Sequence, residues 1–391
     1  MLDFLSSGLL TVFAFVAVIS IVVVIHELGH YLAGRACGIH AEVFSLGFGP
    51  TLFAVRDRQG TIWRIAALPL GGYVRFLGDA GAASEPDQAK LAEMREKLGA
   101  DADRCFHFKP VWQRAIVVAA GPIANFILAI VIFAAFFMAF GQIAQQPVVG
   151  SVNAGSEAER AGFEAQDRIV SIEGRRITEF SEIMTEFMLR PNEQVDIVVE
   201  RNGAEVTLHA TPRIESVPDR FGGSRDRAII GFQSSGEVFR QRLNPVEAVG
   251  AAFARVSSVV ETTVRYVTRI VTGRAPANML NGPVGIVTVS GQLANEAASN
   301  APNAGAAVTG VALNIIQLAA FFSIGLGLVN LLPIPILDGG HLVYYAYEAV
   351  AGRPLSAKAQ EIGFRVGLAL VLGLMLVATW NDLVYLGGSG S

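Results

Sequence analysis

Two histidines and a glutamate near the start of the chain have the spacing of a metal site. His26, Glu27 and His30 belong to the sequence His-Glu-Leu-Gly-His, which follows a stretch from Phe4 to Ile25 without a charged residue. On a helix, the two histidines share one face and can bind one zinc ion, and the glutamate can take a proton from a water. A chance match and a capped helix end are the alternatives. Ionisable groups at membrane depth are costly, so this location favours a function.

A catalytic zinc needs three protein ligands and an open position, and Asp338 is the candidate for the third ligand. This aspartate closes an uncharged stretch that begins at Ala297. Two prolines shortly before it break the helix, and two glycines directly after it free the backbone, so the carboxylate can turn away from lipid. A cap on a membrane helix is the alternative role for Asp338, and His341 is an alternative ligand.

Two asparagines in apolar segments also need partners. Asn330 could hydrogen-bond substrate backbone or help to stabilise a tetrahedral oxyanion, although contact between helices is an alternative. Asn125 follows Gly121-Pro122-Ile123-Ala124 in another apolar segment. We interpret that segment mainly as core packing, with Asn125 as a residue that supports the site or contacts substrate.

The composition is that of an integral membrane protein with some soluble mass. The 391 residues are 52% hydrophobic and 16% charged, whereas soluble proteins average about a quarter charged. The net charge of −4 gives no reason to expect a nucleic-acid partner. Two cysteines, Cys37 and Cys105, form no disulfide framework or thiolate metal site by number or spacing. Four apolar segments predict membrane spans: Phe4 to Tyr31, Ala115 to Gly141, Val311 to Ile336 and Ile362 to Leu386.

The basic residues that border these spans predict their orientation. No lysine or arginine precedes Arg35 or follows Arg365, whereas basic residues follow spans one and three. The positive-inside rule therefore places both termini outside and the loops after spans one and three in the cytoplasm. The histidine motif then lies toward the cytoplasmic end of the first span.

Two glycine-rich apolar stretches follow the first span. One contains Gly47, Phe48 and Gly49, and the other contains Gly71, Gly72 and Tyr73. Both are too short to span a bilayer and too rich in glycine for stable helices. We expect membrane-associated β-hairpins there, since non-helical backbone at membrane depth must be buried or line a cavity.

The composition turns soluble after residue 147. Strand and helix patterns alternate as far as residue 235, and Asn202-Gly203 predicts a tight hairpin between two strands. This α+β order resembles a PDZ domain, a fold that recruits peptides by strand addition; a plug or spacer is the alternative role. Residues 236–300 form a partly amphipathic connector, in which Pro245 to Val271 is helical and lies on the membrane surface or packs as a soluble helix.

The order of the motifs resembles the site-2 protease family of intramembrane zinc metalloproteases, in its bacterial regulator-of-sigma-E branch. The motifs are His26 to His30, Gly121 to Asn125, and Asn330-Leu331-Leu332-Pro333 with Leu337-Asp338-Gly339. The resemblance implies one zinc ion per chain, bound by His26, His30 and Asp338, with Glu27 as catalytic base and Asn330 as a substrate-positioning residue. It also implies substrate contacts from the glycine-rich stretches (Gly47, Phe48, Gly49, Gly71, Gly72 and Tyr73), Asn125 and Pro333. One PDZ-like domain replaces the tandem pair of the best-known members.

We therefore expect a polytopic α-helical membrane protein with four transmembrane helices, membrane-associated β-hairpins and an inserted α+β PDZ-like domain. Residues 1–146 hold spans one and two with a cytoplasmic or re-entrant β loop, 147–235 the periplasmic PDZ-like domain, 236–300 the connector and 301–386 spans three and four. Residues 387–391 resemble an added linker. The expected activity is cleavage of single-span membrane proteins: an anti-sigma factor after a first cut, or remnant signal peptides. A membrane adaptor with a structural metal, or a transporter, is the alternative.

Overall fold

The structure is a computed structural model that describes residues 2–78, 88–218, 224–274 and 283–388. The chain forms two compact units. Unit 1 comprises residues 1–133 and 285–377, and unit 2 comprises residues 134–284 and 378–391. Of the linker-like residues 387–391, the last three lie outside the described part of the chain, as does Gly282 in the connector.

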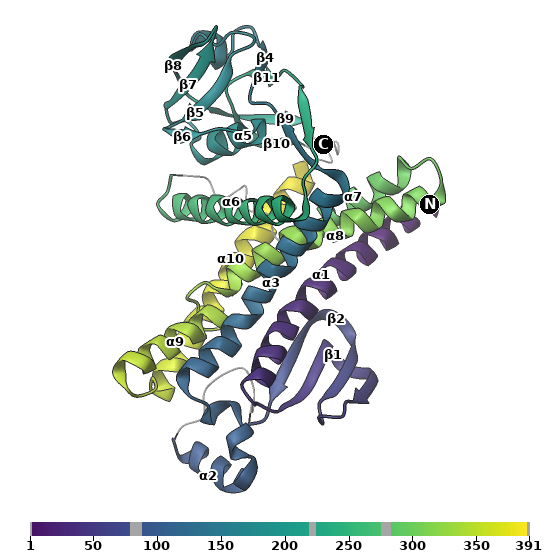
Figure 1. Cartoon of the computed structure of the whole chain (residues 1–391), viewed down its shortest axis with the longest axis vertical. Coiled ribbons are helices and arrows are strands. Elements are labelled where there is room, and N and C mark those ends of the chain that lie inside the picture. Colours follow the sequence, from purple (N-terminus) through teal and green to yellow (C-terminus); the bar gives the residue numbers. More distant parts are fainter. Residues whose placement is uncertain (1, 79–87, 219–223, 275–282, 389–391) are drawn as a thin grey trace. The chain divides into compact units, whose positions relative to one another are not determined.

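Long apolar helices confirm the prediction of a polytopic membrane protein (Figure 1). Within the described residues, four are long and apolar enough to cross a membrane: α1 (Leu2–Ala36), α3 (Val111–Phe140), α8 (Ala304–Asn330) and α10 (Ala357–Gly388). The predicted end of the third span at Ile336 is wrong, because α8 ends at Asn330. Pro333 and Pro335 lack the N–H groups that would bond to carbonyls four residues earlier, so the helix cannot continue through them.

One bent antiparallel hairpin follows α1 in unit 1 (Figure 1). It consists of β1 (Ala41–Arg56) and β2 (Ile62–Phe76). Residues 41–46 lie between residues 72–76 on one side and 62–65 on the other, and residues 51–56 pair with 62–66. Gly47 and Gly49 take φ values of 87° and 86° at the bend, which favour glycine. The two glycine-rich stretches are thus the bends of a single folded hairpin.

Shorter helices complete unit 1. They are α2 (Gln88–Leu98), two 3₁₀ turns (Gly99–Arg104 and Phe106–Phe108), α7 (Pro283–Ser299) and α9 (Asp338–Ala351). Sequence analysis did not predict α7, which it treated as connector. The Asn295 amide of α7 donates to Thr11 Oγ1 of α1 at 3.4 Å, so α7 packs on the first spanning helix. Asp338 stands at the first position of α9.

Unit 2 is built on a sheet with strand order β6-β5-β7-β8. Its strands are β5 (Arg168–Ile172), β6 (Arg175–Arg176), β7 (Val195–Arg201) and β8 (Ala204–Ala210). The predicted hairpin at Asn202-Gly203 is confirmed, and both residues have positive φ, as the tight turn requires. Other elements are α4 (Glu157–Arg160), α5 (Phe180–Leu189), β3 (Gln142–Gln145), β4 (Val149–Val152), β9 (Arg213–Pro218), β10 (Ser224–Ile229), β11 (Phe232–Ser234) and β12 (Val238–Gln241).

Alternating apolar residues of these strands close the core of unit 2 against α5. Ile169, Ile197 and Val199 of the sheet and Ile183 of α5 are fully buried in one cluster. The predicted helix from Pro245 to Val271 is confirmed as α6 (Pro245–Val271), which Asn244 caps through its side chain. Arginines of α6 reach carboxylates of α5 and of the segment that follows it, so the helix is tied to the sheet domain by charge.

Candidate metal centre

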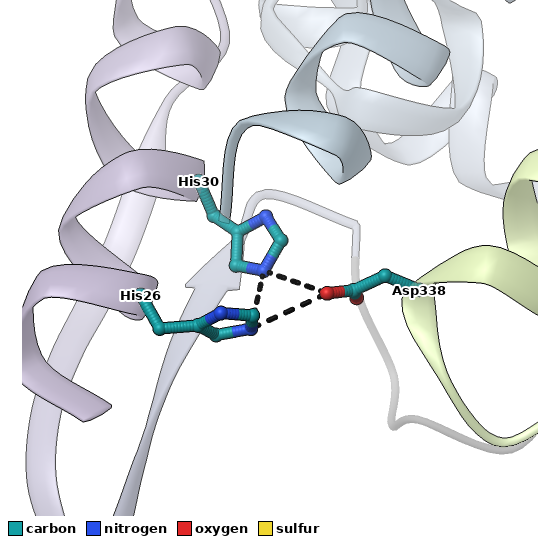
Figure 2. A group of neighbouring side chains, drawn as sticks. All are labelled: His26, His30 and Asp338. Atoms are coloured by element: carbon teal, nitrogen blue, oxygen red, sulfur yellow. Dashed lines mark hydrogen bonds and ion pairs between the residues drawn. The ribbon is translucent and has the colours of Figure 1, made fainter. Parts of the chain in front are cut away.

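The structure brings His26, His30 and Asp338 together although Asp338 is more than 300 positions away in the chain (Figure 2). Nε2 of His26 lies 3.2 Å from Nε2 of His30 and 3.3 Å from Oδ2 of Asp338. The third separation, from Nε2 of His30 to Oδ2 of Asp338, is 3.5 Å. Two imidazoles of one helix and a carboxylate of another thus converge on a single point.

This triangle fits a tetrahedral zinc ion. Zinc bonds of 2.0–2.1 Å place neighbouring ligand atoms about 3.3 Å apart, close to all three separations. Nδ1 of His30 lies 2.8 Å from the carbonyl oxygen of Val117, which only accepts, so Nδ1 carries the proton and Nε2 presents a lone pair. Oδ2 of Asp338 is buried without a hydrogen-bond partner among the described residues. A buried carboxylate oxygen without a donor, facing two imidazole nitrogens, is an environment that suits a cation.

Glycines allow α1 and α3 to approach closely enough to form this centre. A Cβ atom on Gly29 would stand 2.3 Å from the carbonyl oxygen of Ala120. A Cβ atom on Gly121 would stand 2.3 Å from Nε2 of His30 and 2.9 Å from Cε1 of His26. Any side chain at position 121 would therefore collide with both imidazoles.

The turn between α8 and α9 places Asp338. Residues 331–337 are non-helical, and the chain folds back so closely that a Cβ on Gly339 would meet the carbonyl of Leu332 at 2.3 Å. A Cβ on Gly367 of α10 would lie 3.2 Å from Cδ of Pro335, so α10 supports the turn closely. The predicted helix break at the prolines is confirmed, whereas the glycine pair lies within the first turn of α9 and allows the chain to fold back closely. This fixed turn directs the carboxylate toward the histidines (Figure 2).

Backbone of the hairpin holds Glu27. The N–H of Val74 in β2 donates to Oε2 of Glu27 at 3.0 Å. A Cβ on Gly72 would stand 2.7 Å from the carbonyl of Ser45 and 3.4 Å from Cγ of Glu27, so this glycine lets β2 approach α1. Sequence analysis did not predict the hydrogen bond from Val74 to Glu27. Its donor is a backbone N–H, which nearly every residue type has, so the side chain at position 74 does not indicate it.

The other predicted site residues lie in four places. Nδ2 of Asn330 lies 3.5 Å from Nε2 of His26, at the edge of the ligand triangle. Phe48 and Tyr73 stack with ring centroids 6.1 Å apart beside Gly71, at the bend of the hairpin that also holds Gly47 and Gly49. Asn125 is fully buried against His26, and Pro333 is exposed in the turn before α9.

Comparison with known proteins identifies the family. The model of peptidase family M50 matches residues 14–374. Metalloprotease MmpA of Caulobacter vibrioides is 46% identical over 371 residues, which cover 94% of this chain and 93% of the relative. Putative zinc metalloproteases of Agrobacterium fabrum and Brucella suis are 43% and 42% identical, covering 97% and 95% of both chains in each pair. The chain therefore belongs to peptidase family M50, the site-2 protease family, and is a zinc metalloprotease of the membrane.

Proposed function

We propose that the protein is an intramembrane endopeptidase that cleaves transmembrane segments of single-span membrane proteins. The observation that carries this proposal is the convergence of His26 and His30, on a helix apolar enough to cross a membrane, with Asp338, which follows a second such helix. In this proposal the three residues bind one zinc ion and leave a fourth position open. A structural zinc site would be closed by a fourth protein ligand.

Glu27 is the catalytic base in this proposal. When bound, zinc polarises the scissile carbonyl and makes a water acidic. Glu27 accepts the proton of that water and then passes it to the leaving amine. The hydrogen bond from Val74 keeps one carboxylate oxygen on β2, so the other oxygen is directed to the proton. Asn330, at the edge of the ligand triangle, hydrogen-bonds the substrate or its oxyanion.

Substrate binding is assigned to the hairpin. A transmembrane helix hides its amides in its own hydrogen bonds and must unwind before it can be cut. Residues 72–76 pair with β1 on one side, and the N–H of Val74 turns to the other side, toward Glu27. An extended substrate that pairs along this outer side comes to lie beside the base. Exposed Phe48, Leu52 and Leu68 give the bend an apolar surface that suits membrane depth.

Unit 2 supplies a PDZ-like domain at residues 147–235, which recruits or gates substrates. Support comes from the order of its strands and helices around one core. An exposed apolar stripe on α6, formed by Val246, Val249 and Phe253, supports a position of this connector on the membrane surface. The distribution of lysine and arginine supports an inner-membrane protein with periplasmic termini and a cytoplasmic-side active site.

Substrates in this proposal are anti-sigma factors shortened by an earlier protease, with remnant signal peptides as a second class. The test is cleavage of a tagged single-span reporter in liposomes by wild-type protein, Glu27→Gln and a chelator-treated sample. We expect product from wild type alone, and its recovery after zinc is added back to the chelated sample. Equal cleavage by Glu27→Gln would overturn the assignment of the base, and zinc binding by a wild type that cuts no reporter would favour an adaptor.

A further inference from the structure

Asn125 makes a contact with His26 that a role in substrate binding does not explain. Its side chain is fully buried in α3, and Nδ2 lies 3.2 Å from Nδ1 of His26. Its own Oδ1 is buried and accepts no hydrogen bond from any described residue. An unsatisfied buried carbonyl costs about 1–3 kcal/mol, so this oxygen needs a hydrogen-bond donor.

The two histidines differ in what faces their Nδ1 atoms. His30 faces the carbonyl of Val117, an acceptor in every state of the protein. His26 faces a side-chain amide, which offers either a donor or an acceptor after rotation by 180°. Nδ2 of Asn125 lies within hydrogen-bond distance of Nδ1 of His26, whereas Oδ1 has no partner among the described residues.

A zinc-bound His26 requires a hydrogen-bond acceptor at Nδ1. A neutral imidazole that gives the Nε2 lone pair to a metal carries its proton on Nδ1. The Asn125 amide supplies that acceptor when Oδ1 faces Nδ1–H, and this orientation also gives the unpaired oxygen its partner.

We propose that Asn125 is a positioning residue for His26, and that its Oδ1 accepts the Nδ1 proton of His26 when zinc is bound. This inference rests on the proposed zinc ligands and assigns Asn125 to the metal centre instead of to substrate contact. The backbone carbonyl oxygen of Asn125 makes a separate contact and accepts a hydrogen bond of 2.8 Å from the hydroxyl of Ser323 in α8.

The test measures zinc affinity of the full-length protein in detergent by competition with a chelator of known strength. Asn125→Leu keeps the size but removes the acceptor, and we expect its affinity to fall about 10–100-fold. Asn125→Asp keeps an acceptor and retains affinity. Ser323→Ala is the matched control, since it removes the neighbouring bond without touching the amide, and its affinity stays at the wild-type value.

A spectroscopic readout separates positioning from general stability. Cobalt(II) in place of zinc should give a shifted visible absorption in Asn125→Leu, while Ser323→Ala and wild type agree. Wild-type affinity and an unshifted spectrum in Asn125→Leu would overturn this inference and leave the zinc site intact. Failure of the wild type to bind zinc would instead overturn the proposed function. If the leucine variant does not assemble, Asn125→Ala gives the same comparison.

Discussion

Two carboxylates, Asp338 in unit 1 and Glu186 in unit 2, are both largely removed from solvent but have opposite surroundings. The Asp338 side chain faces two imidazoles, and its Oδ2 lacks a hydrogen-bond donor among the described residues. The Glu186 side chain, 2% exposed, meets three arginines. Arg265 binds both of its oxygens at 2.7 and 3.0 Å, and Arg175 and Arg190 add further bonds.

The difference in surroundings distinguishes a carboxylate that can bind a ligand from one that joins two parts of the fold. Glu186 has every charge it needs within the protein, so it joins α5 to α6 and leaves nothing for a ligand. Asp338 and the two histidines converge without a complete set of hydrogen-bond partners among the described residues, an arrangement that suits the zinc ion proposed above. Burial of an acidic group therefore does not by itself indicate function, whereas burial without a complete set of partners does.

The largest effect is expected from Gly121→Ala, which adds a methyl group beside the two histidines. The added Cβ would stand 2.3 Å from Nε2 of His30, so we expect zinc binding and reporter cleavage both to be lost. Helical content should persist, because alanine favours a helix over glycine by about 1 kcal/mol. Gly325→Ala in α8 is the matched control, since its Cβ would meet nothing within 4 Å. Normal zinc content in Gly121→Ala would contradict the assigned position of the ion.

A substitution with a smaller expected effect, Gly72→Ala, tests the position of the base without changing zinc binding. In Gly72→Ala, the Cβ would press on the Ser45 carbonyl and displace β2 from Glu27. We expect cleavage to fall about 100-fold, as a displacement near 1 Å can cause, while zinc content stays at the wild-type level. Zinc analysis and reporter cleavage on the same preparation measure both quantities. Loss of zinc together with activity would show that the hairpin supports the ligands, not the base.

Sequence reasoning predicted which three residues the structure brings together, because each is conspicuous where it stands. His26, His30 and Asp338 are ionisable groups at the ends of apolar stretches, and the prolines before Asp338 mark a broken helix. The presence of four spans and the Asn202-Gly203 hairpin followed from composition and turn chemistry, although the third span ends at Asn330 and not at Ile336. These features depend on neighbours in the sequence, which is why the sequence alone could predict them.

Features that depend on distant contacts were missed. Helix α7 has β-branched residues between 284 and 289, which favour strands, and is held in part by contact with α1. The hydrogen bond from Val74 to Glu27 comes from a backbone N–H, so the type of residue at position 74 does not predict it. The partner of Asn125 depends on which helix α3 packs against, and sequence analysis could state only that the amide needed one.

Substitution of Glu186, whose partners are complete, should lower the stability of unit 2 and leave zinc binding unchanged. Glu186→Gln removes the charge that three arginines share, and we expect unit 2 to lose about 2 kcal/mol of stability because charged hydrogen bonds are replaced by weaker ones. Hydrogen exchange in peptides from β5 to β8 measures this locally, and zinc content should not change. Glu193→Gln is the control: that carboxylate is 42% exposed and its pair with Arg269 should contribute less than about 1 kcal/mol. A loss of zinc in Glu186→Gln would contradict the contrast between the two carboxylates.

The smallest expected effect is the response of Glu186 and its three arginines to acidic pH. Burial raises the pKa of Glu186, but hydrogen bonds from Arg265 and Arg190 outweigh it and hold the pKa below its ordinary value of 4.5. A carboxylate whose pKa is lowered by folding contributes stability that is present above its unfolded pKa and lost as the pH falls through its folded pKa. Between pH 7 and pH 3, protection of β5 to β8 from exchange should therefore fall more in wild type than in Glu186→Gln. An equal fall in protection with pH in both proteins would mean that the arginines do not hold Glu186 ionised. The contact between α5 and α6 would then depend on packing alone.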